Sequence, residues 1–254
     1  MSLPISVRNV SRHFGGVRAV DDVSFEVEPG TVAGLIGPNG AGKTTMFNLI
    51  TGVLSPSAGT VHLGSKDATG AGVGGCSELG VARTFQTPRC FASLTVSQNV
   101  EVMYANPRES LFGSLIGRGP AKAHRTAARE VLGRLGLAHL ADSSTDQLSG
   151  GELRMLEIAR QVAREPRLLM LDEPTAGLDR TYQDQLSKIM ADLVADGTTV
   201  VLVEHNLRFL FENVRQVHVM SAGRLIASGD PETISNDEAV IDAYLGRNSH
   251  AAHS

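Results

Sequence analysis

The residues that decide the fold are Gly37-Pro38-Asn39-Gly40-Ala41-Gly42-Lys43-Thr44. They match the pattern G-x-x-x-x-G-K-[ST], which joins a strand to a helix. Residues 31–36 form a short apolar run typical of a strand, and Met46, Leu49 and Ile50 follow the loop at helical spacing. Gly52 then supplies a helix stop signal. The sequence therefore predicts a strand, a glycine-rich loop and a helix, in that order.

This loop has the chemistry of a phosphate-binding site. Its glycines let consecutive backbone N–H groups turn toward phosphate oxygens, and the N-terminal end of the following helix adds positive potential. We expect Lys43 to place its charge on the β and γ phosphates of a nucleotide, the Thr44 hydroxyl to bind Mg²⁺, and Thr45 to belong to the same site. A glycine-rich turn without a ligand is the alternative, and the flanking strand and helix disfavour it.

The composition is that of a globular chain without a strong charge bias. The 254 residues are 42% hydrophobic and 20% charged, which excludes disorder of the whole chain. A net charge of -4 argues against a general affinity for nucleic acid. Cys76 and Cys90 are too few for a disulfide framework, so we expect both thiols to be free. The first residues lack a signal-peptide pattern, and no apolar run reaches the roughly 20 residues of a membrane span.

Strands come first along the chain, then helices, then buried strands again. The predicted strands are 5–10, 23–27, 31–36, 168–171 and 199–203. Residues 95–164 have a helical pattern, with one apolar face at Leu132, Leu135 and Leu140 and a second at Met155, Ile158, Ala159 and Val162. A helical stretch at 182–195 separates the last two strands, an alternation typical of a parallel sheet. The glycine-rich residues 68–75 are predicted to be an exposed connection.

Two carboxylates end the buried run 168–171. Asp172 and Glu173 lie where ligands bind in open parallel sheets, beyond the carboxyl end of a strand. We expect Asp172 to hold Mg²⁺ directly or through water, and Glu173 to accept a proton from an attacking water as a general base. The alternative is a solvated acidic turn before Pro174.

A second pattern with exposed backbone N–H groups lies more than 100 residues after the phosphate loop. It is the run Leu148-Ser149-Gly150-Gly151-Glu152, which opens a predicted helix with Ser149 as its N-cap. An ordinary capped helix start is the alternative. Two such patterns in one chain resemble the ATP-binding-cassette ATPases. The resemblance implies that residues 149–152 of one subunit contact the γ phosphate held by the phosphate loop of its partner.

Four other residues fit the order of motifs in this family. The resemblance implies that Phe14 stacks on adenine and that Gln86 reaches toward Mg²⁺ and the attacking water. It also implies that Asp179 lies in a loop between subunits and that His205 contacts the γ phosphate. The structural alternatives are a core aromatic, a solvated glutamine, a helix cap and a structural histidine. The strand end before His205 favours contact with a ligand.

The resemblance implies an α/β fold, that of P-loop NTPases with a RecA-like parallel-sheet core, an N-terminal antiparallel β subdomain and an inserted α-helical subdomain. We expect one nucleotide-binding domain over residues 1–254. Its expected parts are 1–86 and 166–225 as catalytic core and β subdomain, 87–165 as helical subdomain with the signature, and 226–254 as C-terminal tail. Five acidic and no basic residues lie in 226–245, and the last residues are expected to be disordered.

Four stretches narrow the resemblance to the ATP-binding subunit of branched-chain amino acid importers. They are HFGGVRAVDDVSFEV, GVARTFQTPRCFASLTVSQNV, SLFGSLIGR and VIDAYLG, whereas the glycine-rich residues 68–75 depart from the more polar sequence of relatives. The resemblance implies ATP and Mg²⁺ as cofactors and a second ABC ATPase subunit in a homo- or heterodimer. It implies two membrane permease subunits, an external solute-binding protein, no nucleic acid, and a peripheral position on the cytoplasmic face of the inner membrane.

Other functions remain as alternatives at this point. A soluble cassette ATPase acting on nucleic acid or a macromolecular assembly usually has two cassettes or a long coiled coil, and this chain has neither. Glu173 and His205 count against a clamp that binds ATP without hydrolysing it. A small-molecule kinase would leave the run 148–152 without a purpose.

Two segments are candidates for contact with the membrane complex. Phe91, Leu94 and Val96 form either a groove for a permease helix or internal core. Residues 108–134 carry six basic and two acidic residues, a local charge of +4. This segment faces anionic lipid headgroups or, as the favoured interpretation, forms a solvated helical face.

Overall fold

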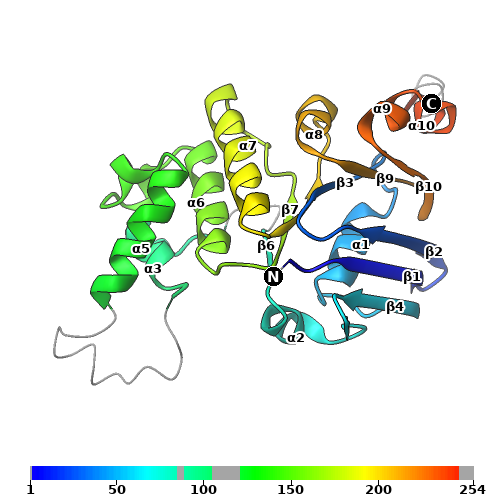
Figure 1. Cartoon of the computed structure of the whole chain (residues 1–254), viewed down its shortest axis with the longest axis horizontal. Coiled ribbons are helices and arrows are strands. Elements are labelled where there is room, and N and C mark those ends of the chain that lie inside the picture. Colours follow the sequence, from blue (N-terminus) through cyan, green and yellow to red (C-terminus); the bar gives the residue numbers. More distant parts are fainter. Residues whose placement is uncertain (1, 85–88, 105–120, 246–254) are drawn as a thin grey trace. The chain divides into compact units, whose positions relative to one another are not determined.

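The computed structural model describes residues 2–84, 89–104 and 121–245 (Figure 1). By their contacts the residues form two compact units. Unit 1 comprises Met1–Arg83, Arg167–Glu173 and Leu193–Ser254, and unit 2 comprises Thr84–Pro166 and Pro174–Asp192. Within the described residues, no helix is both long enough and apolar enough to cross a membrane.

Unit 1 contains a six-stranded sheet with the order β10-β9-β3-β8-β7-β6. The strands are β3 (Val32–Ile36), β6 (Val81–Arg83), β7 (Leu168–Asp172), β8 (Thr199–Val203), β9 (Gln216–Ser221) and β10 (Arg224–Gly229). The pairs from β9 through β6 are parallel, and β10 joins β9 in the antiparallel sense. Every residue of β3, β7 and β8 is buried, which explains their continuous apolar sequences. The carboxyl ends of the parallel strands meet at one edge of the sheet.

A second sheet of unit 1 is antiparallel and has the order β2-β1-β4-β5. Its strands are β1 (Ile5–Phe14), β2 (Val17–Val27), β4 (Ala58–Leu63) and β5 (Lys66–Asp67). The first two are longer than predicted, because Gly15 and Gly16 form the hairpin turn between Phe14 and Val17 rather than a longer break. The predicted α/β fold with a parallel core and an antiparallel β part is confirmed.

The helices of unit 1 are α1 (Lys43–Ile50), α2 (Gly72–Glu78), α8 (Leu207–Asn213), α9 (Pro231–Ser235) and α10 (Glu238–Leu245). The predicted helix after the phosphate loop is confirmed as α1. The prediction for 68–75 is confirmed in its exposure, since Gly70, Ala71, Val73 and Gly74 are exposed. It is wrong in expecting no regular element, because Ala68 is buried and α2 begins at Gly72. A Cβ on Gly52 would lie 2.5 Å from the Gly72 carbonyl oxygen, so a larger residue does not fit at Gly52, where the chain approaches the start of α2.

Unit 2 is helical. Its elements are α3 (Val96–Glu101), α5 (Ala121–Arg134), the 3₁₀ turns η1 (Ala138–Leu140) and η2 (Thr145–Gln147), α6 (Gly150–Val162) and most of α7 (Arg180–Ala195). The predicted buried face of α6, from Met155 to Val162, is confirmed. On the other predicted face Leu132 and Leu135 are fully buried while Leu140 is only partly buried, because the chain leaves the helix before Gly136.

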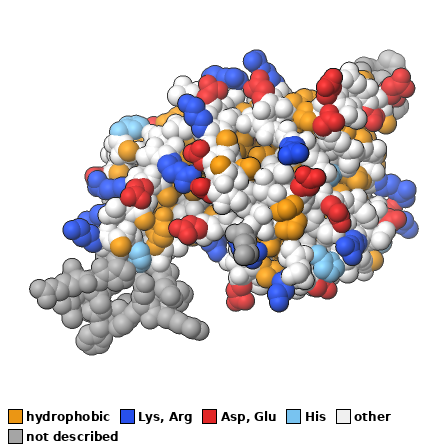
Figure 2. All heavy atoms as spheres, in the orientation of Figure 1, with side chains coloured by type: hydrophobic (Ala, Val, Ile, Leu, Met, Phe, Trp, Pro, Cys, Tyr) orange, Lys and Arg blue, Asp and Glu red, His pale blue; other side chains and the backbone are white. Residues whose placement is uncertain are grey.

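The C-terminal segment is folded as far as residue 245. It contributes β10, α9 and α10, which lie together in Figure 1, and residues 246–254 lie outside the described part. Cys76 is buried, Cys90 is partly buried, and both are free thiols, as predicted. Figure 2 shows basic and acidic side chains interspersed over the face in view.

Candidate nucleotide site

The phosphate loop connects β3 to α1 in unit 1. Gly37, Gly40 and Gly42 have φ angles of 148, 76 and 99 degrees, in the region that favours glycine. A Cβ on Gly37 would lie 2.0 Å from the Met220 carbonyl oxygen, so no other residue fits there without rearrangement. No acidic residue lies in the first turn of α1. The helix start therefore presents its positive end without a side-chain anion of its own.

Lys43 lies beneath this loop, with 6% of its surface exposed. Its Nζ donates hydrogen bonds to the carbonyl oxygens of Gly37 at 2.6 Å and Pro38 at 3.1 Å. Asn39, Gly40 and Thr44 are exposed. The loop is thus closed around its lysine and keeps its middle residues and the Thr44 hydroxyl open to a ligand.

Glu173 and His205 meet at the carboxyl ends of β7 and β8. Glu173 has a φ of 47 degrees, and its N–H donates to the Val203 carbonyl oxygen at 2.8 Å, which extends the β7–β8 pairing by one residue. The His205 Nε2 lies 2.9 Å from the Glu173 Oε1. The His205 side chain is 45% exposed and the Glu173 side chain 28%, so water reaches the pair. In the sheet β8 lies next to β3, and β7 lies next to β8. Glu173 and His205 therefore lie at the same end of the sheet as the phosphate loop, which follows β3.

Sequence reasoning missed Glu204, which fixes the turn that carries His205. Its carboxylate is 2% exposed, and Oε2 accepts hydrogen bonds from the N–H groups of His205 at 3.1 Å and Asn206 at 3.2 Å. Asn206 then caps α8 by accepting from the Phe209 N–H. The only sequence signal was a glutamate between an apolar strand and a histidine, which reads as a solvated loop residue.

Asp172 is the last residue of β7 and is 5% exposed. A carboxylate and the Thr44 hydroxyl are hard oxygen donors, which suit Mg²⁺ when phosphate oxygens and water complete the coordination. Among the described residues, no group of three or more His, Cys, Asp or Glu side chains could hold a metal alone. The donors present therefore fit a metal bound together with a phosphate ligand. Gln86, the other predicted metal contact, lies outside the described residues.

Phe14 ends β1 and is 45% exposed, so the alternative of a core aromatic is wrong. The guanidinium of Arg12 lies 4.8 Å from the centre of its ring. Arg12 thus covers one face of the Phe14 ring in a cation–π contact, in which the positive charge is attracted by the electrons of the ring face.

The signature run 148–152 begins α6 in unit 2. The Ser149 Oγ accepts from the Glu152 N–H at 3.2 Å, and the Glu152 Oε2 accepts from the Ser149 N–H at 2.7 Å, which makes a reciprocal capping box. The hydrogen bonds from the backbone and side chain of Ser149 lower the pKa of the Glu152 carboxyl. The Tyr182 hydroxyl also donates to its Oε1 at 3.4 Å. The predicted N-cap is confirmed.

The two glycines of the signature differ in their surroundings. A Cβ on Gly150 would meet no atom within 4 Å, whereas one on Gly151 would lie 3.4 Å from the Gly177 carbonyl oxygen. As the first two residues of α6, both have N–H groups without an intrahelical acceptor. Asp179 accepts from the Tyr182 N–H at 3.0 Å and so caps the start of α7, which was the structural alternative for this residue.

Of the residues predicted to form either a groove or internal core near residue 91, one is in the core and another is exposed. Val96 is fully buried and belongs to the core of unit 2, which corrects its assignment to a groove. Phe91 is 49% exposed, its ring lies 4.8 Å from the Arg160 guanidinium, and its N–H donates to Asn99. Asn99 also holds the Leu94 carbonyl, so this loop is fixed while the Phe91 ring faces solvent.

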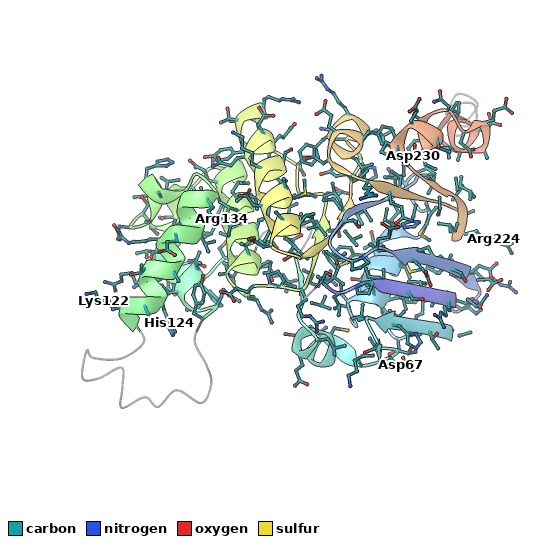
Figure 3. The ribbon with its side chains drawn as sticks, in the orientation of Figure 1. Asp67, Lys122, His124, Arg134, Arg224 and Asp230 are labelled. Carbon is teal, nitrogen blue, oxygen red and sulfur yellow. The ribbon has the colours of Figure 1, made fainter. Side chains whose placement is uncertain are left out.

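The basic segment 108–134 is a solvated helical face wherever the structure describes it. Figure 3 shows Lys122, His124 and Arg134 along α5. Arg125, Arg129 and Arg134 lie 3.7, 2.7 and 3.8 Å from the carboxylates of Glu101, Asp142 and Asp192. Arg108, Glu109 and Arg118 lie outside the described residues. The charge of the described part is therefore largely compensated by neighbouring carboxylates.

A phosphate loop after the central strand, with a carboxylate and a histidine at neighbouring strand ends, defines a P-loop nucleotide hydrolase. The family comparison agrees, since residues 20–176 match the model of the ABC transporter family. A second model, described as the branched-chain amino acid ATP-binding cassette transporter, matches residues 224–250. The chain belongs to the ABC transporter family and is one of its ATP-binding, ATP-hydrolysing proteins.

Relatives and solved structures cover almost the whole chain. The high-affinity branched-chain amino acid transport ATP-binding protein LivG of Escherichia coli (strain K12) is 38% identical, over 97% of this chain and 99% of the relative. BraF of Pseudomonas aeruginosa, with the same description, is 38% identical with the same coverage. The ADP conformation of MJ1267, an ATP-binding cassette of an ABC transporter, is 31% identical with a TM-score of 0.83, covering 97% of this chain and 100% of that one.

Proposed function

We propose that this chain is the ATP-hydrolysing subunit of an importer that takes up branched-chain amino acids or a related small polar solute through membrane permease partners. The observation that carries the hydrolytic part is the 2.9 Å contact between Glu173 Oε1 and His205 Nε2 at the edge of the sheet that bears the phosphate loop. The solute class rests on the names of the relatives and on the C-terminal match at 224–250.

Nucleotide binding is assigned to residues 37–45. Backbone N–H groups of the loop, together with the start of α1, would contact the phosphates, and the Lys43 Nζ would exchange its bonds to Gly37 and Pro38 for phosphate oxygens. Phe14 would stack on the adenine with the ring face that Arg12 leaves open. Thr44, Asp172 and Gln86 would hold Mg²⁺, which supplies charge compensation to the β and γ phosphates.

Hydrolysis is assigned to Glu173 and His205. Glu173 orients a water and takes its proton as the water oxygen bonds to the γ phosphorus and the bond to the bridging oxygen of ADP breaks. His205, placed by the Glu204 carboxylate, orients the Glu173 side chain and can donate a hydrogen bond to a γ-phosphate oxygen. ADP and inorganic phosphate are the products.

The signature helix is assigned to the nucleotide of a second subunit. Ser149 and Gly150 are exposed at the start of α6, and Gly151 is buried next to them. Together they offer a hydroxyl and two N–H groups, which suit a γ phosphate held by another chain. Glu152 and Asp179 maintain this surface through the Tyr182 side chain and backbone. Two chains would thus enclose two ATP molecules, and loss of the γ phosphate would release the pair.

The partners follow from this role. They are a second ABC ATPase subunit, two membrane permease subunits and, indirectly, an external solute-binding protein, with the chain held peripherally on the cytoplasmic face of the inner membrane. The exposed Phe91 ring is the side chain we assign to a permease helix.

The proposal is tested by purifying the chain with an affinity tag from detergent-solubilised membranes. We expect two strongly apolar permease subunits to co-purify, and vesicles containing the complex to take up leucine, isoleucine or valine only with ATP and the solute-binding protein. Purification of the chain alone, or together with ribosomes or nucleic acid, would contradict the proposal.

A further inference from the structure

The β9–β10 turn lies against the phosphate loop within unit 1. β9 is the parallel neighbour of β3, with Val219 paired to Ile36, so its end lies beside the first residue of the loop. The chain then reverses at Ala222 and Gly223, whose φ angles are 47 and 81 degrees. This tight turn brings backbone groups of Gly223 to two other elements.

Gly223 bridges the phosphate loop and β2 with its backbone. Its N–H donates to the carbonyl oxygen of Ala41 at 3.0 Å, and its carbonyl oxygen accepts from the Asp21 N–H at 2.8 Å. Ala41 is fully buried, so Gly223 supplies the partner that its carbonyl needs away from water. A side chain is disfavoured at this position, since a Cβ on Gly223 would lie 3.0 Å from the Arg18 carbonyl oxygen and 3.1 Å from that of Ala19.

Arg224 fastens the same turn from its outer side. Its guanidinium donates to the Asp21 Oδ2 from Nε at 3.1 Å and from Nη2 at 2.7 Å. Figure 3 shows Arg224 at the outer margin of the two sheets. The hydrogen bond and the charge of Arg224 lower the pKa of the Asp21 carboxyl. The first residue of the C-terminal family match therefore secures the turn that holds Ala41.

The C-terminal helix α10 also reaches the loop. Burial raises the pKa of the Tyr244 phenol, and a hydrogen bond from the backbone of Gly37 opposes this shift. Residues from the last third of the chain thus contact the loop at two residues. Met220 lies next to Gly37, and Gly223 is hydrogen-bonded to Ala41.

We propose that the turn Ser221–Arg224 braces the phosphate loop, and that Gly223 and the Arg224–Asp21 pair are positioning residues for nucleotide binding. This proposal rests on the assignment of residues 37–45 as the nucleotide site. The brace holds the Ala41 carbonyl and so fixes the direction of the loop N–H groups before the nucleotide arrives. Loosening it lowers nucleotide affinity without removing any group that touches the nucleotide.

Two glycines with the same backbone strain provide the test. Gly197 has a φ of 88 degrees and Gly223 one of 81 degrees, but a Cβ on Gly197 would meet no atom within 4 Å. We expect Gly223→Ala and Gly197→Ala both to lower the thermal unfolding midpoint, Gly223→Ala by more, because its Cβ also crowds the Arg18 and Ala19 carbonyl oxygens. In titration calorimetry of the full chain with MgADP, only Gly223→Ala should raise the Kd, by about tenfold, the equivalent of one lost hydrogen bond. Equal Kd values for the two variants overturn the brace.

A pair of arginines gives a second arm that does not depend on the folding of Gly223→Ala. Arg129 and Arg224 each place Nη2 2.7 Å from an aspartate, in unit 2 and unit 1 respectively. Arg224→Ala should raise the Kd for MgADP by about threefold, and Arg129→Ala should leave it unchanged. A Kd of Arg224→Ala equal to that of Arg129→Ala contradicts the proposal. Failure of the wild-type chain to bind MgADP, in contrast, would overturn the assignment of the nucleotide site itself.

Discussion

The phosphate loop and the signature helix start are both rich in glycine and backbone N–H groups. They differ in charge and in the side chains that form hydrogen bonds with their backbone groups. The loop in unit 1 surrounds a buried lysine and has no acidic residue in the helix turn that follows it. The signature in unit 2 carries its own carboxylate, with Glu152 bonded to the Ser149 N–H. We therefore expect the loop to bind phosphate alone, whereas the signature offers only two helix N–H groups and one hydroxyl.

This difference separates the two steps of the proposed cycle. A site with a buried cation can hold a nucleotide in a single chain, because the charge compensates the phosphates. We expect a site with its own anion to bind ATP only when the phosphate is already held by a second chain opposite to it. The loop is thus assigned to binding and the signature to pairing, and variants should affect these two properties separately.

The largest effect is expected at Glu173. Glu173→Gln keeps the size of the side chain but removes the base, so turnover should fall by about 10²–10⁴-fold while the Kd for MgATP stays unchanged. Phosphate release and equilibrium binding measure the two quantities. Glu130→Gln, at an exposed position of α5, is the control. Turnover of Glu173→Gln near the wild-type rate would reject its role as base.

Lys43→Ala tests the loop's ability to bind alone. The variant loses the charge-assisted bonds to phosphate and the bonds that close the loop on Gly37 and Pro38. The Kd for MgATP should rise by about 100-fold, as measured with a fluorescent ATP analogue. Lys188→Ala on the exposed side of α7 should bind normally. A Kd within twofold of the wild type would contradict the assignment.

A smaller effect is expected at Ser149, and unit 2 contains a matched control. Thr95 and Gln98 form a capping box on α3 like that of Ser149 and Glu152 on α6. Ser149→Ala and Thr95→Ala should each cost about 1 kcal/mol in free energy of unfolding. Only Ser149→Ala should also reduce turnover, by about tenfold, with the Kd for MgATP unchanged. Equal turnover in the two variants would make the signature an ordinary helix cap.

The smallest effect on activity is expected at His218, a buried residue of unit 1 that should make the free energy of unfolding depend on pH. His218 is paired with Leu35 of β3, its ring packs on Phe25, and burial lowers its pKa from 6.5 to about 4. As the pH falls below 6.5, the unfolded chain binds a proton that the folded chain does not, so stability decreases until the pH reaches about 4. The loss at pH 5 should be about 2 kcal/mol, and His218→Gln should abolish it.

Urea unfolding of wild type and His218→Gln at pH 7, 6 and 5 measures this difference. The Glu152 carboxyl does not interfere, because its pKa lies below its ordinary value of 4.5 and its stabilisation persists until the pH falls through that lowered pKa. Identical pH profiles of the two proteins would show that the buried His218 is not the cause.

The sequence predicted the parts whose chemistry depends on local order. The phosphate loop, the buried strands around it, the N-cap at Ser149 and the free cysteines could be read from residue spacing alone. The sequence also placed Glu173 and His205 each at the end of a strand, whereas their 2.9 Å contact is a finding of the structure. Contacts between distant backbone groups could not be predicted in this way.

The missed features depend on such contacts. Glycine composition suggested a connection without regular structure at 68–75, but α2 begins there at Gly72, whose carbonyl oxygen lies close to Gly52. Glu204 looked like a solvated carboxylate until the backbone of His205 and Asn206 turned toward it. Gly223 gave no signal, since its role is to support Ala41, which is 182 positions away in the numbering.

The claim that the nucleotide joins two chains is tested most directly by the mass of the Glu173→Gln protein with MgATP, measured by sedimentation velocity. The account predicts a dimer for Glu173→Gln and a monomer for Glu173→Gln with Gly150→Phe, since a side chain at Gly150 has open space in one chain but would block a partner's phosphate. Both proteins should bind MgATP with the same Kd. A dimer of the double variant, or wild-type turnover by Gly150→Phe alone, would contradict the account.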